Sequence, residues 1–142
     1  MNPGYHDVRF RAELPTAGLP TAFGVVTACN PDGRTVTDEE NLQATEALRS
    51  ALTAEGYFFF PVTGGSSDFT HCEPGFGVLF KTPEEVVSWG RRFAQEAVFW
   101  IHEGRVHLVP CGGSASVELS PWQSLAEAAA QQPIFSSPDS PS

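Results

Sequence analysis

The fold of this chain is decided by the stretch Phe23-Gly24-Val25-Val26-Thr27-Ala28-Cys29-Asn30-Pro31-Asp32-Gly33. An apolar run here meets Asn-Pro-Asp-Gly, which is a turn signal, and a helix start follows within a few residues. We therefore predict a strand over residues 23–29 that leads through a turn into a helix. Side chains at such a strand end are held rigidly and still reach solvent, so we also expect a ligand site at this turn.

Two predicted helices begin with the same device. Residues 37–40, Thr-Asp-Glu-Glu, form a capping box, in which the threonine hydroxyl accepts a hydrogen bond from the third helical amide and Glu40 reaches back. This helix should run to about Glu55 and end at Gly56, because glycine readily adopts the left-handed conformation that closes helices. Residues 82–85, Thr-Pro-Glu-Glu, repeat the start signal with proline at the first helical position.

Apolar segments around these helices predict a weakly alternating edge strand over 8–14 and further strands over 57–63, 72–80, 97–101 and 105–111. The order favours an α+β fold in two layers, with a mainly antiparallel sheet of about five strands and two helices on one face. This is the ferredoxin-like β-α-β-β-α-β order plus a C-terminal hairpin strand, although other two-layer topologies share the same element order.

Length and composition indicate one domain. We assign residues 1–111 of the 142-residue chain to a single α+β domain. Beyond Gly112 the composition changes, so residues 112–142 are expected to be an extension with a short helix over 121–132 and a disordered Ser/Pro-rich tail.

The charge argues against two classes of partner. The net charge is −9 and the eight basic residues are scattered, whereas nucleic-acid grooves and anionic membrane surfaces are bound by clustered Lys and Arg. No apolar run approaches the roughly 20 residues that span a bilayer, and the N-terminus lacks the pattern of a signal peptide. Three cysteines cannot all pair within one chain, which indicates a reduced, cytoplasmic protein. The oligomeric state stays open.

Asn41 is a polar residue on the helical face that should be buried. It lies below Leu48 and Leu52 at helical spacing, so its amide must find hydrogen-bond partners or cost about 1–3 kcal/mol. We expect those partners in the Thr27–Gly33 turn. Asn41 then either holds its own loop in place by hydrogen bonds or contacts a ligand.

Glu73 begins the predicted strand 72–80. Strict alternation places it on one face with Gly75 and Gly77, which leaves an open furrow beside the carboxylate. A carboxylate at this position needs a charged or hydrogen-bonding partner, which would be Arg92, His71 or a ligand. Glu73 then has either a structural role, in an ion pair or at a solvated strand edge, or a functional role as an acid, a base or a ligand anchor.

Gln95 and Arg92 lie where the second helix meets the next strand. Gln95 should point inward with the apolar face of that strand, as a helix cap or a ligand contact. Arg92 has three possible roles: it neutralises Glu73, it binds an anion, or it lies on the surface.

Metal and thiol chemistry are weakly supported. Cys29, His71, Cys72 and Cys111 lack the Cys-x-x-Cys or His-x-x-x-His spacing of a zinc site, so we predict no metal and no cofactor. Cys29 as a nucleophile would depend on His71 as its base.

Four spaced segments of the chain form a set: Val26-Thr27-Ala28-Cys29-Asn30-Pro31, Glu40-Asn41, His71-Cys72-Glu73-Pro74-Gly75-Phe76 and Arg92-Phe93-Ala94-Gln95-Glu96-Ala97-Val98-Phe99-Trp100. Together they resemble the bacterial family called domain of unknown function 3293. The resemblance covers roughly residues 23–103 and implies no known activity; it implies that Thr27, Asn30, Asn41, Glu73 and Gln95 belong to one recurring pattern. Cys29 and Gly75 depart mildly from this pattern.

Two functions follow as hypotheses. The first is binding of a small polar or nucleotide-like ligand at a site lined by Thr27, Asn30, Asn41, Glu73, Arg92 and Gln95. If the protein is an enzyme, it is a hydrolase or transferase with Glu73 as general acid or base. The second is a structural or protein-interaction module in which the same polar residues form a closed network.

Overall fold

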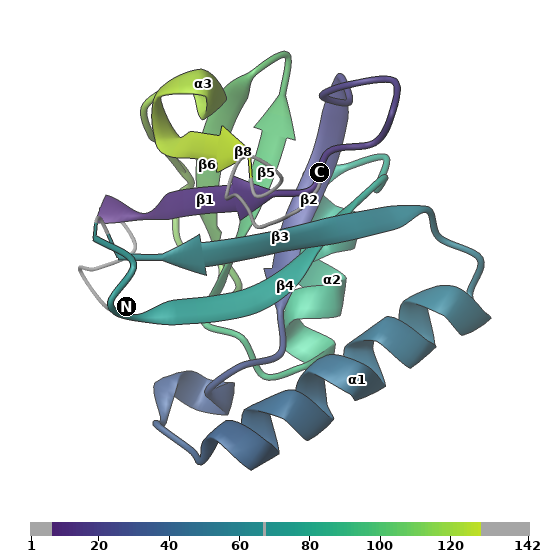
Figure 1. Cartoon of the computed structure of the whole chain (residues 1–142), viewed down its shortest axis with the longest axis vertical. Coiled ribbons are helices and arrows are strands. Elements are labelled where there is room, and N and C mark those ends of the chain that lie inside the picture. Colours follow the sequence, from purple (N-terminus) through teal and green to yellow (C-terminus); the bar gives the residue numbers. More distant parts are fainter. Residues whose placement is uncertain (1–6, 67, 129–142) are drawn as a thin grey trace, which may run out of the picture.

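One eight-stranded, mixed sheet, strongly curled into a half-barrel, and two main helices form an α+β structure (Figure 1). The computed structural model describes residues 7–66 and 68–128. The strands lie in the order β7-β6-β5-β2-β4-β3-β1-β8. The elements along the chain are β1 (Arg9–Ala12), β2 (Ala22–Thr27), a 3-10 turn (Pro31–Gly33), α1 (Asp38–Ala54), β3 (Phe59–Gly65), β4 (Cys72–Val78), α2 (Pro83–Arg92), β5 (Ala97–His102), β6 (Arg105–Pro110), β7 (Val117–Glu118), α3 (Trp122–Leu125) and β8 (Ala126–Ala128).

The four central strands have the split arrangement that the element order predicts. Helix α1 connects β2 to β3, and β4 lies between these two strands in the sheet. Helix α2 connects β4 to β5, and β2 lies between them. Each central strand is antiparallel to its neighbours. The crossovers are therefore interleaved, which brings the end of β2 beside the start of β4.

The outer parts of the sheet differ from the prediction of about five strands. Strand β1 is not an edge, because β8 lies outside it and pairs with it in parallel. Strand β7 adds a further strand beyond β6. Strand twist accumulates across eight strands, so the sheet curls and its concave side holds a second core, which a flat two-layer sandwich would lack.

The helix predicted over 121–132 was wrong in its length. In its described part, residues 121–128, Trp122–Leu125 form α3 and Ala126–Ala128 form β8. The ring of Trp122 stacks on Phe10 of β1 with centroids 5.1 Å apart, which brings the following residues against that strand. Backbone pairing with β1 then outweighs the helix propensity of alanine. The rest of the expected helix and the expected tail lie outside the described residues.

The two faces of the sheet carry separate apolar clusters. Leu48 and Leu52 of α1 and Val86 and Trp89 of α2 pack on one face, so both helices cover the same side, as predicted. The concave face is filled by aromatic and aliphatic side chains that include Phe10, and α3 covers part of it (Figure 1). Among the described residues, no helix is long and apolar enough to cross a membrane.

Helix α2 approaches the sheet closely through two glycines. A Cβ atom on Gly24 of β2 would lie 2.6 Å from Cγ2 of Val86, and one on Gly90 of α2 would lie 2.5 Å from Cγ1 of Val98. Real Cβ atoms do not come so close to their neighbours. Both glycines are therefore required by the packing of this helix.

Replacing Gly90 by alanine should lower the free energy of unfolding by about 1–3 kcal/mol, because overpacking outweighs the better helix propensity of alanine. Chemical denaturation measures the change, with Ser88→Ala as the control at an exposed position of the same helix. A Gly90→Ala protein as stable as the Ser88→Ala protein would contradict the close packing.

The three cysteines are free thiols in different surroundings. Cys29 and Cys111 are buried, and Cys72 is exposed. Burial raises the pKa of the Cys29 thiol and of the Cys111 thiol above the ordinary value. Because the thiolate is the reactive form, both buried cysteines are poor nucleophiles.

An aromatic disulfide reagent at pH 8 should therefore label Cys72 rapidly in the native protein, and the other two cysteines only in denaturant. Mass spectrometry of the labelled peptides measures this order. Labelling of native Cys29 as fast as Cys72 would show that its thiol is accessible and activated.

Candidate functional site

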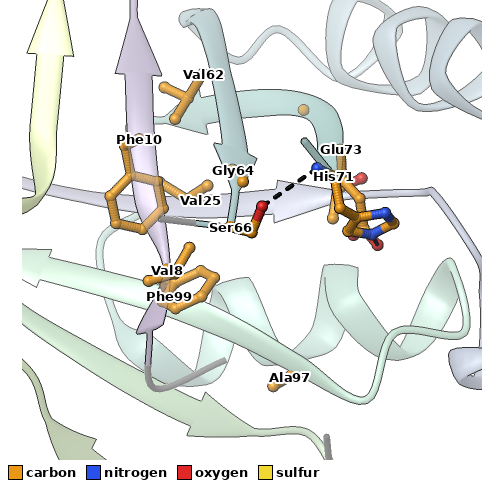
Figure 2. A pocket seen from close by; sticks show the side chains of 13 residues that line it. Val8, Phe10, Val25, Val62, Gly64, Ser66, His71, Glu73, Ala97 and Phe99 are labelled. Carbon is orange, nitrogen blue, oxygen red and sulfur yellow. Dashed lines mark hydrogen bonds and ion pairs between the residues drawn. The ribbon is translucent and has the colours of Figure 1, made fainter. Parts of the chain in front are cut away.

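A cavity of about 160 Å³ opens on the concave face of the sheet (Figure 2). Its apolar wall consists of Val8, Phe10, Val25, Val62, Ala97 and Phe99. Figure 2 shows His71 and Glu73 at the opposite side from Phe10 and Phe99. The cavity thus has an apolar body and a polar end. The remaining lining residues are Thr27, Gly64, Gly65, Ser66 and Gly75.

Glu73 reaches the cavity because of the alternation of β4. It shares the concave face with Gly75, as the sequence predicts, and both line the cavity. The predicted furrow does not extend to Gly77, since the ring of Phe60 lies 2.5 Å from where a Cβ atom would be. The open space along β4 therefore ends before Gly77.

One oxygen of the Glu73 carboxylate is engaged by the protein. Its Oε2 atom accepts a hydrogen bond from Nδ2 of Asn30 at 3.1 Å and lies 3.3 Å from Nε2 of His71. Its Oε1 atom has no hydrogen-bond partner among the described residues. The side chain is 23% exposed. The site therefore offers a fixed carboxylate with one open acceptor.

Asn30 is held by Asn41 in a reciprocal pair. The backbone N–H of Asn30 donates to Oδ1 of Asn41 at 2.8 Å, and Nδ2 of Asn41 donates to Oδ1 of Asn30 at 3.0 Å. The backbone N–H of Val36 donates to the same Oδ1 at 3.3 Å. Asn30 has a left-handed backbone, with φ of 47°. The predicted partners of Asn41 in the turn are confirmed.

Thr27 and Gln95 hold the end of β2. The hydroxyl of Thr27 donates to the carbonyl of Pro74 at 3.0 Å and accepts from the backbone N–H of Cys29 at 3.0 Å. The side chain of Gln95 is buried, and its Nε2 donates to the carbonyls of Cys29 and Phe93 at 3.0 and 3.1 Å. Gln95 is thus buried, as predicted, but it does not line the cavity with Ala97 and Phe99; it joins the residues after β2 to the end of α2.

Arg92 lies in another part of the surface. Its Nη1 atom is 2.6 Å from Oε2 of Glu55, and its guanidinium lies over the ring of Trp89. The chain turns between Arg92 and Gln95 at Ala94, which has a left-handed backbone with φ of 58°. Hydrogen bonds therefore link Asn30 to Asn41 and to Glu73. Thr27 and Gln95 both bind the backbone of Cys29, and Arg92 lies apart from these residues on the helical side of the sheet.

Thiol and metal chemistry find little support at this site. Besides burial, which raises the pKa of Cys29, the neighbouring Glu73 carboxylate acts in the same direction. Among the described residues, no group of three or more His, Cys, Asp or Glu side chains could hold a metal ion.

Sequence reasoning missed the apolar wall. Residues such as Phe10, Val62 and Phe99 read as ordinary core positions, and only the curl of the sheet leaves space among them. A signal was present in Gly64-Gly65, two glycines at the end of a strand, since glycine in a strand often marks a close approach or a ligand.

Comparison with known proteins identifies a family and nothing beyond it. No curated protein and no solved structure matches the chain. Residues 26–98 match the family described as "Protein of unknown function (DUF3293)", and this segment contains the turn, both main helices and Glu73. Because the match spans just over half of the 142 residues, the chain belongs to this family.

Proposed function

We propose that this domain binds a small molecule in the cavity of the half-barrel. The apolar body of the ligand would lie against Phe10, Val62 and Phe99, and its polar head would meet Glu73. An engineered protein cavity of about 150 Å³ binds benzene, so a cavity of about 160 Å³ accepts a body the size of one aromatic ring. Sites for drug-sized ligands are larger, at roughly 300–1,000 Å³.

The proposal modifies the expectation of a polar or nucleotide-like ligand. The cavity is smaller than a nucleotide requires and its wall is mostly apolar. The side-chain amides of Asn30, Asn41 and Gln95 already bond to groups of the protein. We therefore assign the polar contact with the ligand to Glu73, and assign the three amides and the hydroxyl of Thr27 to holding the site in position.

The observation that carries the proposal is the open space at Gly64. A Cβ atom on Gly65 would clash with the ring of Phe69, and one on Gly75 would lie 2.5 Å from the carbonyl oxygen of Val26. A Cβ atom on Gly64 would meet only Cγ2 of Val8, at 3.8 Å, among the described residues. Glycine within a strand costs about 0.5–1 kcal/mol relative to alanine. Packing does not require Gly64, whereas a ligand beside it does.

A purely structural role is the second candidate. Asn30 bonds to both Asn41 and Glu73, and such links are what a closed structural network requires. The two candidates differ in one respect: a structural module has no use for an open cavity or for the unpaired Oε1 atom of Glu73. Ligand binding therefore discriminates between them.

An enzymatic version gives Glu73 the role of general acid or base in a hydrolase or transferase. It is the one carboxylate that lines the cavity within the described part of the chain, and His71 lies beside it.

The three free thiols favour a reducing compartment such as the cytoplasm.

Replacing Gly64 by valine should abolish binding of benzyl alcohol, the probe for a ring-sized ligand with a polar head. The new side chain would occupy the cavity from the strand, with no clash at its Cβ atom. The free energy of unfolding should stay the same or rise by up to about 1 kcal/mol, since a strand glycine is removed. Saturation-transfer NMR measures binding, and urea denaturation measures stability.

Gly112→Val is the matched control. A Cβ atom at position 112 would also lie in open space, and Gly112 does not line this cavity. Equal binding of benzyl alcohol by both variants and by the unmodified chain would place the binding elsewhere. No saturable binding by the unmodified chain would favour the structural role.

A further inference from the structure

We propose that the ligand carries a protonated amine, so that the site selects small amines with a ring-sized apolar body. The inference rests on the proposed function and names the substrate class of the same cavity. It follows from the charge of the cavity, from the kind of polar atom that is left open and from the way in which that atom is held.

The charged side chains around the cavity favour a cationic ligand. The described lining of the cavity contains one carboxylate, Glu73, and no Lys or Arg. His71 is the other titratable group; it lies at the polar end, and its side chain is 68% exposed. Arg92 is paired with Glu55 and does not neutralise the site. The net charge of −9 adds a field that draws cations toward the protein.

At the polar end of the cavity, beside the ring of His71, one carboxylate oxygen is left open as an acceptor. The hydroxyls of Thr27 and Ser66 each donate one hydrogen bond and accept another within the protein. The Oε1 atom of Glu73 has neither kind of partner among the described residues. A ligand head that meets this oxygen must therefore donate a hydrogen bond. An ammonium donor forms a charge-assisted bond, which is shorter and stronger than a neutral one.

The carboxylate is held before the ligand arrives. Asn30 donates to Oε2 of Glu73, and Asn41 prevents the Asn30 amide from turning, because it engages both the side chain and the backbone of Asn30. A fixed acceptor loses little conformational freedom on binding, and this raises affinity. A carboxylate or phosphate head would instead meet a like charge.

Three probes of nearly the same shape test the charge of the head: benzylamine, benzyl alcohol and benzoate, each titrated at pH 7 by NMR into the full chain. A charge-assisted bond should make benzylamine bind at least about tenfold more tightly than benzyl alcohol. Benzoate should bind most weakly. In Glu73→Gln, benzylamine and benzyl alcohol should bind with affinities within about threefold of each other.

Glu39→Gln is the control for net charge, because it removes one exposed carboxylate from α1 and should leave the tenfold preference intact. The order of the affinities of the three probes for the unmodified chain tests the charge of the ligand head even if Glu73→Gln fails to fold. Equal binding of benzylamine and benzyl alcohol would overturn the amine and leave the ligand cavity standing. Saturable binding by none of the three probes would overturn both proposals.

Discussion

The reciprocal hydrogen bonds between Asn30 and Asn41 join the end of β2 to the first turn of α1, and the position of Glu73 depends on them. Asn30 adopts a left-handed backbone, which asparagine tolerates better than most residues. That conformation turns its amide toward Asn41 and Glu73 together. Losing one partner would leave half-buried donors and acceptors of the other unsatisfied, which costs stability.

The curl of the sheet is the second constraint, and it gives the two faces different tasks. The face under α1 and α2 is tightly packed, to the point that Gly24 and Gly90 have no room for a side chain. The concave face is lined by the second core, and near Gly64 this core leaves a cavity. The polar network lies where the end of β2 meets the start of β4, so it can present Glu73 to the concave side.

Much of the central fold could be predicted from local signals. The capping box of Thr37 and Glu40 is present as expected, and Thr82 caps α2 with Pro83 at its start. These signals act within a few residues, so a sequence reveals them directly. Strands β7 and β8 could not be predicted in this way, because they are short and depend on pairing with β6 and β1.

The candidate site was predictable where neighbours along the chain alternate regularly. The common face of Glu73 and Gly75 followed from strand periodicity. Strand periodicity did not predict the position of Arg92, because the left-handed turn at Ala94 makes the side chain of Arg92 point in another direction than that of Gln95. The cavity itself depends on the curl of the whole sheet, which no local pattern encodes.

The most direct test of this account is a double-mutant cycle on the Asn30–Asn41 pair. Asn30→Gly removes the side chain and keeps the left-handed backbone accessible, Asn41→Ala removes its partner, and urea denaturation gives the free energy of unfolding of each protein. The account predicts a coupling energy of about 1–2 kcal/mol between the two changes. Additive losses, within about 0.5 kcal/mol, would contradict the claim that this pair holds the site together.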